Sequence, residues 1–188
     1  MYDRYDGLIF DMDGTILDTE PTHRKAWHQV LDRYGMTFDE SAMIGLNGSP
    51  SWRIAEVIIA SHQADLDPYV LAAQKTAALN EMLLDSVQPL PLVEVVKAYH
   101  GRRPMAVGTG SEHAMADRLL LHLGIRNCFD AIVGADDVTR HKPEPETFLR
   151  CAQLIGVEPG KCVVFEDADF GLQAAKAAGM DVVDVRTL

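Results

Sequence analysis

The chain has 188 residues, of which 47% are hydrophobic and 24% charged, so it is long enough to bury a core of its own. Its 17 basic and 28 acidic residues leave a formal net charge of -11, which argues against nucleic-acid binding and against a polybasic membrane-surface protein. No apolar run reaches the roughly 18 residues of a membrane span. The acidic start MYDRYDGLIF is a poor signal peptide, so we expect a cytoplasmic protein with no membrane partner.

Short apolar segments rich in Val and Ile recur along the chain. Such runs are typical of strands buried on both faces of a parallel sheet, and they cover residues 7–10, 105–107, 131–133, 162–165 and 181–185. Apolar residues at helical spacing, each time followed by Gly, predict helices over residues 113–123, 145–155 and 171–178. The alternation of strand and helix predicts an α/β fold with a doubly wound parallel sheet.

One interval breaks this alternation. From Leu17 to Ser86 the sequence shows helical periods but no convincing strand. Helices are expected over residues 22–34, 51–61 and 68–84, and a turn-rich loop separates the first two. We therefore predict a core domain of residues 1–16 and 87–188, with a helical cap domain of residues 17–86 inserted after the first strand.

Two acidic residues close the first predicted strand, in the run Asp11-Met-Asp13-Gly14-Thr. Side chains two apart on a strand share one face, so Asp11 and Asp13 can converge on one ligand. Gly14 allows the chain to turn sharply beside them. Open α/β sheets bind ligands at this carboxyl edge, although an acidic pair alone is more typical of a solvated turn.

Three later segments also follow predicted strands. Residues 108–111, with the sequence GTGS, offer a hydroxyl and backbone N–H groups to an anion, or form an ordinary turn before a helix. Lys142 is a cation after the third strand, or a solvated charge. Glu166 and Asp167 suit a hard divalent cation, or are acids favoured at a helix N-terminus.

Taken in order, these segments form one set: DxDGT, then a Thr, then Lys-Pro, then an acidic pair with a Gly four residues after it. The set resembles the haloacid dehalogenase superfamily, and specifically its phosphatase branch. The resemblance covers the whole chain, because the helical insert falls where that family carries its small cap domain. Within the superfamily the chain is most similar to the β-phosphoglucomutase-like group, and there to bacterial fructose-1-phosphate phosphatases of about this length.

The resemblance implies a role for each residue of the set. Asp11 is the expected nucleophile, which takes the phosphoryl group as an aspartyl phosphate. Asp13 is the expected general acid for the leaving alkoxide and then the base for water. Thr109 is expected to bind the phosphoryl oxygens, and Lys142 to neutralise Asp11 and the phosphate.

The same resemblance implies a divalent metal cofactor. Magnesium is expected, with other divalent cations as alternatives. Its implied ligands are Asp167, the side chain of Asp11 and the backbone carbonyl of Asp13, with Glu166 acting through water.

Substrate contacts are the least defined part of the prediction. One candidate lies on each of the first two expected helices of the insert, two lie in the loop between those helices, and two follow the second strand. These residues are His23, Ser51, Asn47, Gly48, Gly110 and Ser111. His23 fits a surface position on an amphipathic helix equally well.

The cap loop separates two reactions of this group. The mutases carry a Lys before the glycine that aligns with Gly48 and an Arg three residues after it. This chain has Asn47 and Ser51 at those positions, which favours a phosphatase acting on a monophosphate. Arg53 could supply a cation from the next turn and keeps the mutase open.

The leading hypothesis is therefore a magnesium-dependent hydrolase of a small sugar monophosphate, with fructose 1-phosphate first, acting as a monomer or weak oligomer. One alternative is a β-phosphoglucomutase-type isomerase. An alternative of another class is a non-catalytic signalling module phosphorylated on Asp. Receiver modules of that kind place the phosphorylated Asp after the third strand, whereas Asp11 follows the first.

Overall fold

The computed structural model describes residues 1–43, 46 and 50–188. The chain forms two compact units. The core unit comprises Met1–Asp18 and Gln88–Leu188, and the helical unit comprises Thr19–Val87.

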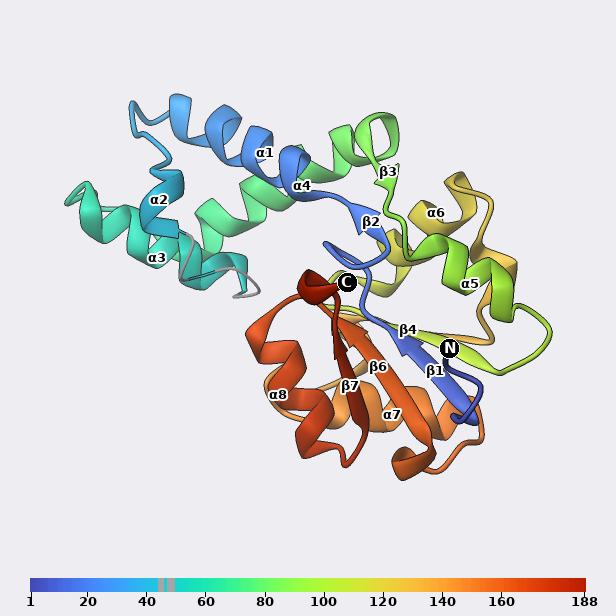
Figure 1. The fold of residues 1–188 in the computed structure, drawn as a ribbon. Coiled ribbons are helices and arrows are strands. Elements are labelled where there is room, and N and C mark those ends of the chain that lie inside the picture. The colour runs from blue at the N-terminus through green and yellow to red at the C-terminus, as the bar shows by residue number, and fades with distance from the viewer. Residues whose placement is uncertain (44–45, 47–49) are drawn as a thin grey trace. The chain divides into compact units, whose positions relative to one another are not determined.

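The core unit is built on a five-stranded sheet in which all neighbouring strands are parallel (Figure 1). Its order is β5-β4-β1-β6-β7, from Ala131–Val133, Met105–Gly108, Gly7–Phe10, Cys162–Glu166 and Asp181–Asp184. The central strand β1 pairs on both sides, with Leu8 opposite Met105 and Val163. Because the strands are parallel, the residues that follow β1, β4 and β6 emerge at the same edge of the sheet.

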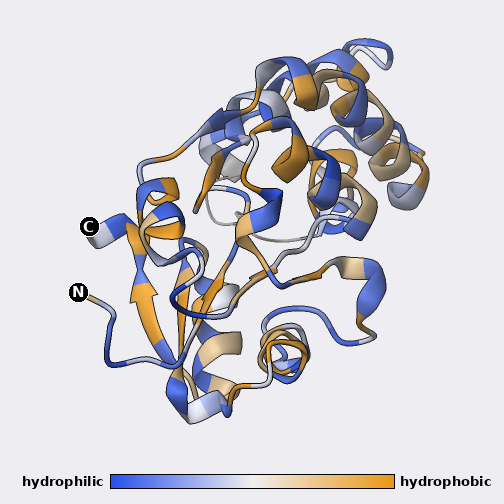
Figure 2. Ribbon diagram, turned by 90° about the vertical axis from the view of Figure 1, so that its right-hand side faces the viewer, coloured by the Kyte–Doolittle hydropathy of each residue, from blue (hydrophilic) through white to orange (hydrophobic). Residues whose placement is uncertain are grey.

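Helices cover both faces of this sheet: α5 (Val93–Tyr99), α6 (His113–His122), α7 (Glu146–Leu154) and α8 (Asp169–Ala177). On one face, Ile9 and Val164 pack against Phe148 of α7 and Ala174 of α8 in one buried cluster. Helices α5 and α6 lie on the other side (Figure 1). Figure 2 shows the hydrophobic residues concentrated in the strands between these layers. The predicted doubly wound α/β fold is confirmed.

Short 3₁₀ turns complete the core connections: η2 (Arg126–Cys128), η3 (Ala135–Asp137), η4 (Pro159–Lys161) and η5 (Val185–Thr187). The strand predicted over residues 181–185 ends at Asp184, and its residues are exposed or half-buried rather than buried on both faces. The reason is its helix packing: β7 is an edge strand packed mainly by α8, whereas β5, at the other edge, is packed by both α6 and α7 and is buried. Helix α5 was not predicted, since its seven residues are too few to show a clear period.

The prediction that no strand lies between Leu17 and Ser86 is wrong at its first residues. Strand β2 (Leu17–Asp18) pairs antiparallel with β3 (Gln88–Pro89), and both belong to the core unit. Two residues cannot display the alternation by which a strand is recognised in sequence. This ribbon forms because the chain returns from the helical unit beside the point where it left the core.

The helical unit consists of α1 (Glu20–Asp32), α2 (Glu40–Met43), α3 (Ser51–Ser61) and α4 (Pro68–Ser86). Helices α1 and α3 both pack against α4. The indole of Trp27 stacks on Phe38 with ring centroids 6.0 Å apart. Asp67 caps α4, because its carboxylate accepts a hydrogen bond from the Tyr69 N–H at 2.7 Å. Within the described residues, no helix has the length and apolar character needed to cross a bilayer.

Candidate active site

The candidate site lies at the carboxyl edge of the core sheet. Asp11 directly follows β1, Thr109 directly follows β4, and Glu166 ends β6. Adjacent parallel strands bring these three residues together, although Asp11 and Glu166 are 155 positions apart in the sequence. The site is therefore formed by the sheet topology, within the core unit.

Lys142 links two carboxylates in the centre of the site. Its ammonium donates hydrogen bonds to Asp11 Oδ1 and to Glu166 Oε2, both at 2.7 Å. The Lys142, Asp11 and Glu166 side chains are only 13%, 8% and 1% exposed. Burial alone would lower the pKa of Lys142, but Asp11 and then Glu166 raise it above its ordinary value. Lys142 is thus a permanent cation held directly against the predicted nucleophile.

Glu166 is fixed from several sides. Its Oε1 accepts the backbone N–H groups of Asp167 and Ala168 at 3.1 and 3.0 Å, while Oε2 accepts from Lys142. A Cβ added to Gly171 in α8 would lie 1.8 Å from Oε2, so only glycine leaves room for this carboxylate. This glycine belongs to the sequence motif around the acidic pair, and its place against Glu166 explains why the motif contains a glycine.

Three carboxylates of the site can share one ion. Oxygens of Asp11, Glu166 and Asp167 all lie within 4.8 Å of one another, a hard-oxygen set that suits a divalent cation such as magnesium. Asp13 offers no carboxylate oxygen to this group, in keeping with a role for its backbone carbonyl only. Thr15 orients Asp167 by a hydrogen bond of 3.0 Å from its hydroxyl.

The pKa values of the cluster reflect crowded negative charge. Burial and the neighbouring Glu166 raise the pKa of Asp167 to about 6. Burial, followed by Glu166, raises the pKa of Asp11 well above its usual value, and Lys142 opposes that shift. One lysine therefore does not balance the carboxylates, and a bound divalent cation would supply the missing positive charge.

Asp13 faces the segment after β4. Its Oδ2 accepts hydrogen bonds from the Ser111 hydroxyl at 2.9 Å and from the Thr109 hydroxyl at 3.2 Å. The Thr109 hydroxyl also accepts the Ser111 N–H at 3.0 Å. Gly110, between them, is exposed and has no atom near the position of an added Cβ. The predicted set of Asp13, Thr109 and Ser111 is thus assembled into one network.

The helical unit holds a cation that the sequence analysis missed. Lys75 on α4 is only 2% exposed, and its ammonium lies 2.9 Å from His23 Nδ1 and 3.4 Å from the Ser51 hydroxyl. It also lies over the Trp27 ring, 5.6 Å from the centroid. Within an Ala- and Leu-rich helix a lysine is normally a solvated residue, so nothing in the sequence marked it.

Two predicted substrate residues, Asn47 and Gly48, lie outside the described residues. The other two candidates of the helical unit, His23 and Ser51, lie together around Lys75.

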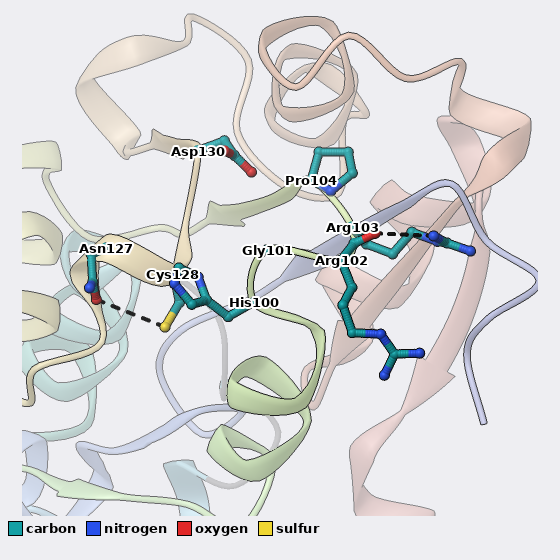
Figure 3. Close-up of a pocket in the computed structure, with 8 residues that line it drawn as sticks. All are labelled: His100, Gly101, Arg102, Arg103, Pro104, Asn127, Cys128 and Asp130. Carbon is teal, nitrogen blue, oxygen red and sulfur yellow. Dashed lines mark hydrogen bonds between the residues drawn. The ribbon is translucent and has the colours of Figure 1, made fainter.

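A separate pocket of about 330 Å³ lies at the opposite edge of the core sheet (Figure 3). Its lining residues precede β4 and β5: His100, Gly101, Arg102, Arg103, Pro104, Asn127, Cys128 and Asp130. Arg103 donates to the Tyr5 carbonyl at 2.9 Å, and Asp130 accepts the Met105 N–H at 2.8 Å. These charged side chains form hydrogen bonds with backbone groups of the core unit. The residues that line the pocket include none of the carboxylate site.

Comparison with known proteins identifies the family of the chain. A family model for haloacid dehalogenase-like hydrolases matches residues 5–179, a range that includes every residue of the candidate site. The chain belongs to this hydrolase family. The family predicted from the order of the motifs is therefore confirmed, which favours an enzyme over a non-catalytic signalling module.

Individual relatives of this hydrolase are also phosphate-processing enzymes. It is 71% identical to "Fructose-1-phosphate phosphatase YqaB" of Escherichia coli strain K12, over the full length of both chains. It is 31% identical to "Validoxylamine A 7'-phosphate phosphatase" of Streptomyces hygroscopicus subsp. limoneus, covering 97% of this chain and 86% of the other. The crystal structure of β-phosphoglucomutase from Clostridium difficile superposes with a TM-score of 0.79 and 26% identity, covering 95% and 83% of the two chains.

Proposed function

We propose that this hydrolase removes phosphate from a small sugar monophosphate, with fructose 1-phosphate as the leading substrate. The observation that carries the proposed chemistry is the ammonium of Lys142, 2.7 Å from both Asp11 and Glu166 in a nearly buried cluster. The proposed substrate rests on the relative with 71% identity.

Asp11 is the proposed nucleophile. A carboxylate oxygen of Asp11 attacks phosphorus, an O–P bond forms, and the bond from phosphorus to the sugar oxygen breaks. Lys142 neutralises part of the charge that would otherwise repel an anionic phosphoryl group from a carboxylate. Thr109, directly after β4, is the proposed hydroxyl donor to the phosphoryl oxygens.

Asp13 is the proposed acid and base. It gives a proton to the leaving sugar oxygen and later takes one from the water that attacks the aspartyl phosphate. This second attack releases inorganic phosphate and restores the Asp11 carboxylate. The hydroxyl of Ser111 holds the Asp13 carboxylate during both transfers, while the single hydroxyl proton of Thr109 turns from Asp13 to the phosphoryl group.

The proposed metal ligands are the carboxylates of Asp11 and Asp167 and the backbone carbonyl of Asp13. The clustered oxygens of Asp11, Glu166 and Asp167 fit a magnesium ion or another hard divalent cation. When bound, the ion supplies positive charge to the transferring phosphoryl group. Glu166, whose oxygens already accept from Lys142 and two backbone N–H groups, would act through water.

Selection of the sugar is proposed to depend on the helical unit. The buried cation Lys75, with His23 and Ser51 beside it, supports this part of the proposal. Asn47 and Gly48 are retained as proposed contacts. We further propose a monomer or weak oligomer working in the cytoplasm, which size-exclusion chromatography and cell fractionation would test.

The test is a phosphate-release assay over a panel of sugar phosphates with magnesium. The proposal predicts that fructose 1-phosphate has the highest kcat/KM of the panel. A parallel assay for glucose 6-phosphate, with β-glucose 1-phosphate as substrate, separates hydrolysis from isomerisation. Glucose 6-phosphate formed without free phosphate would replace the proposed phosphatase by a mutase.

A further inference from the structure

The loop that holds Asp13 is itself held by the segment after β5. The Thr109 N–H donates to the Val133 carbonyl at 2.9 Å, and the Ala135 N–H donates to the Ser111 carbonyl at 2.9 Å. Both ends of the 109–111 loop are thus tied to residues 133–135. The position of the Ser111 hydroxyl on Asp13 therefore depends on how β5 continues into η3.

A pair of side chains joins the two segments beyond that point. His113 Nδ1 lies 2.6 Å from Asp137 Oδ2, and the His113 N–H donates to Asp136 Oδ1 at 2.7 Å. Asp137 Oδ2 also accepts the Gly134 N–H at 2.8 Å. Burial raises the pKa of Asp137, but the bonds from Gly134 and His113 outweigh it and hold that pKa below its usual value. Asp137 is thus an anion that ties the first turn of α6 to η3.

Gly134 allows the two segments to approach this closely. A Cβ added there would lie 2.4 Å from the His113 nitrogen and 2.7 Å from its Cα. Both are backbone atoms, which cannot rotate away as a flexible side chain can. The contact between the start of α6 and η3 is therefore built into the backbone, and the His113–Asp137 pair closes it.

We propose that the His113–Asp137 pair is a positioning device for Ser111 and, through Ser111, for the carboxylate of Asp13. His113 is the first residue of α6 and lies two residues after Ser111. Loss of the pair loosens the 109–111 loop, although its backbone bonds to residues 133–135 remain, and shifts the Ser111 hydroxyl away from Asp13. The consequence is a poorly placed proton donor, with Asp11 and Lys142 left intact. This inference rests on the proposed acid and base role of Asp13.

The chemistry of the leaving group separates positioning from general loss of structure. A sugar alkoxide is a poor leaving group and needs a proton as it departs, whereas p-nitrophenolate leaves without one. A displaced Asp13 therefore lowers kcat/KM for a sugar phosphate, because kcat/KM covers the steps up to departure of the leaving group, and spares kcat/KM for p-nitrophenyl phosphate. Hydrolysis of the aspartyl phosphate, for which Asp13 is the proposed base, is common to both substrates and does not enter this ratio. A merely structural defect lowers the amount of active enzyme and slows both substrates by the same factor.

The experiment compares variants at His113 with a matched control on the same helix. His113→Ala removes the side-chain donor, and His113→Asn returns an N–H donor near the position of Nδ1. Asp117→Ala breaks the pair of Asp117 with Arg126, which is equally short at 2.6 Å and similarly exposed, at 36% and 31% against 42% and 28% for His113 and Asp137.

We expect His113→Ala to lower kcat/KM for fructose 1-phosphate by about tenfold, a fraction of what general acid catalysis supplies. The kcat/KM for p-nitrophenyl phosphate should change less than about twofold, His113→Asn should restore kcat/KM for the sugar phosphate, and Asp117→Ala should match the wild type. Asp137→Asn, which weakens the same pair from the other side, should repeat the selective loss and gives a second reading if His113→Ala does not fold.

Asp13→Asn in the same assays tests the acid role of Asp13 separately from the positioning role of the His113–Asp137 pair. If Asp13→Asn lowers kcat/KM for both substrates equally, the proposed acid role of Asp13 is wrong. If Asp13→Asn is selective but the His113 and Asp137 variants slow both substrates equally, or slow neither, the positioning role of the pair is overturned.

Discussion

Replacing Gly171 by Ala should destabilise this protein, although it lies inside a helix. Gly-to-Ala changes in a helix interior normally stabilise by about 0.5–1 kcal/mol, because alanine loses less backbone freedom on folding. At Gly171 the added Cβ would meet Glu166, with Oε2 at 1.8 Å, Cδ at 2.0 Å and Cγ at 2.5 Å. The Glu166 side chain is 1% exposed and has no open space into which to swing.

The magnitude follows from what Glu166 must give up. Overpacking of a dense interior costs about 1–3 kcal/mol, and breaking a buried ion pair by displacing one partner adds to that cost. We expect a net loss of at least about 1–3 kcal/mol after the gain in helix propensity. For a chain of this length that corresponds to a fall in Tm of about 2–12 °C, at roughly 2–4 °C per kcal/mol.

Activity should fall with stability, because Glu166 holds Lys142 against Asp11. A displacement of about 1 Å at a catalytic group can cost about 10²-fold in rate, so we expect kcat to fall by that order. The assays are thermal unfolding by circular dichroism and phosphate release at a temperature where the variant is fully folded. Gly160→Ala is the matched control, since its Cβ would meet nothing nearer than 4.0 Å. A Gly171→Ala protein more stable than the wild type and fully active would refute the packing argument.

Three further predictions concern charge. Lys142→Met leaves Asp11 and Glu166 buried without their shared cation, so kcat for phosphate release should fall by about 10²–10³-fold; activity near that of the wild type would contradict the role. Because the pKa of Asp167 is raised from 3.8 to about 6, metal affinity measured by calorimetry should increase as pH rises through about 6. By the same linkage, the free energy of unfolding of the metal-free protein should fall as pH rises from 3.8 to about 6, because Asp167 ionises less readily in the folded state. Magnesium should abolish that part of the loss. A metal affinity that does not change with pH would contradict both predictions. Lys75→Met should raise KM for fructose 1-phosphate and leave p-nitrophenyl phosphate hydrolysis unchanged, and an unchanged KM would exclude Lys75 from substrate selection.

The sequence predicted those parts of the fold that local pattern encodes. Four of the five strands are continuous apolar runs because both of their faces are covered, and such runs are legible without a structure. Strands β2 and β3 were not predicted, since each has only two residues and is defined by its pairing with the other. The paired residues Asp18 and Gln88 are about 70 positions apart in the sequence.

For the candidate site too, the sequence predicted some features and not others. Asp11, Lys142 and Asp167 were recognised because each follows a strand in a fixed order, and the parallel sheet then brings them to one edge. The contacts that position them were not predicted, since they depend on distances between side chains. The bond from Ser111 to Asp13 and the burial of Lys75 have no local signature in the sequence. Sequence pattern thus predicted the groups that are proposed to react, whereas the contacts that support them depend on packing in three dimensions.

The most direct test of the account is phosphate release from fructose 1-phosphate by the Asp11→Asn variant, with saturating magnesium. Asparagine keeps the size of Asp11 but has no carboxylate oxygen to attack phosphorus. The account predicts a rate at least about 10³-fold below that of the wild type, in a protein whose circular dichroism is unchanged. A variant that still releases phosphate at the wild-type rate would contradict the proposal that Asp11 carries the phosphoryl group.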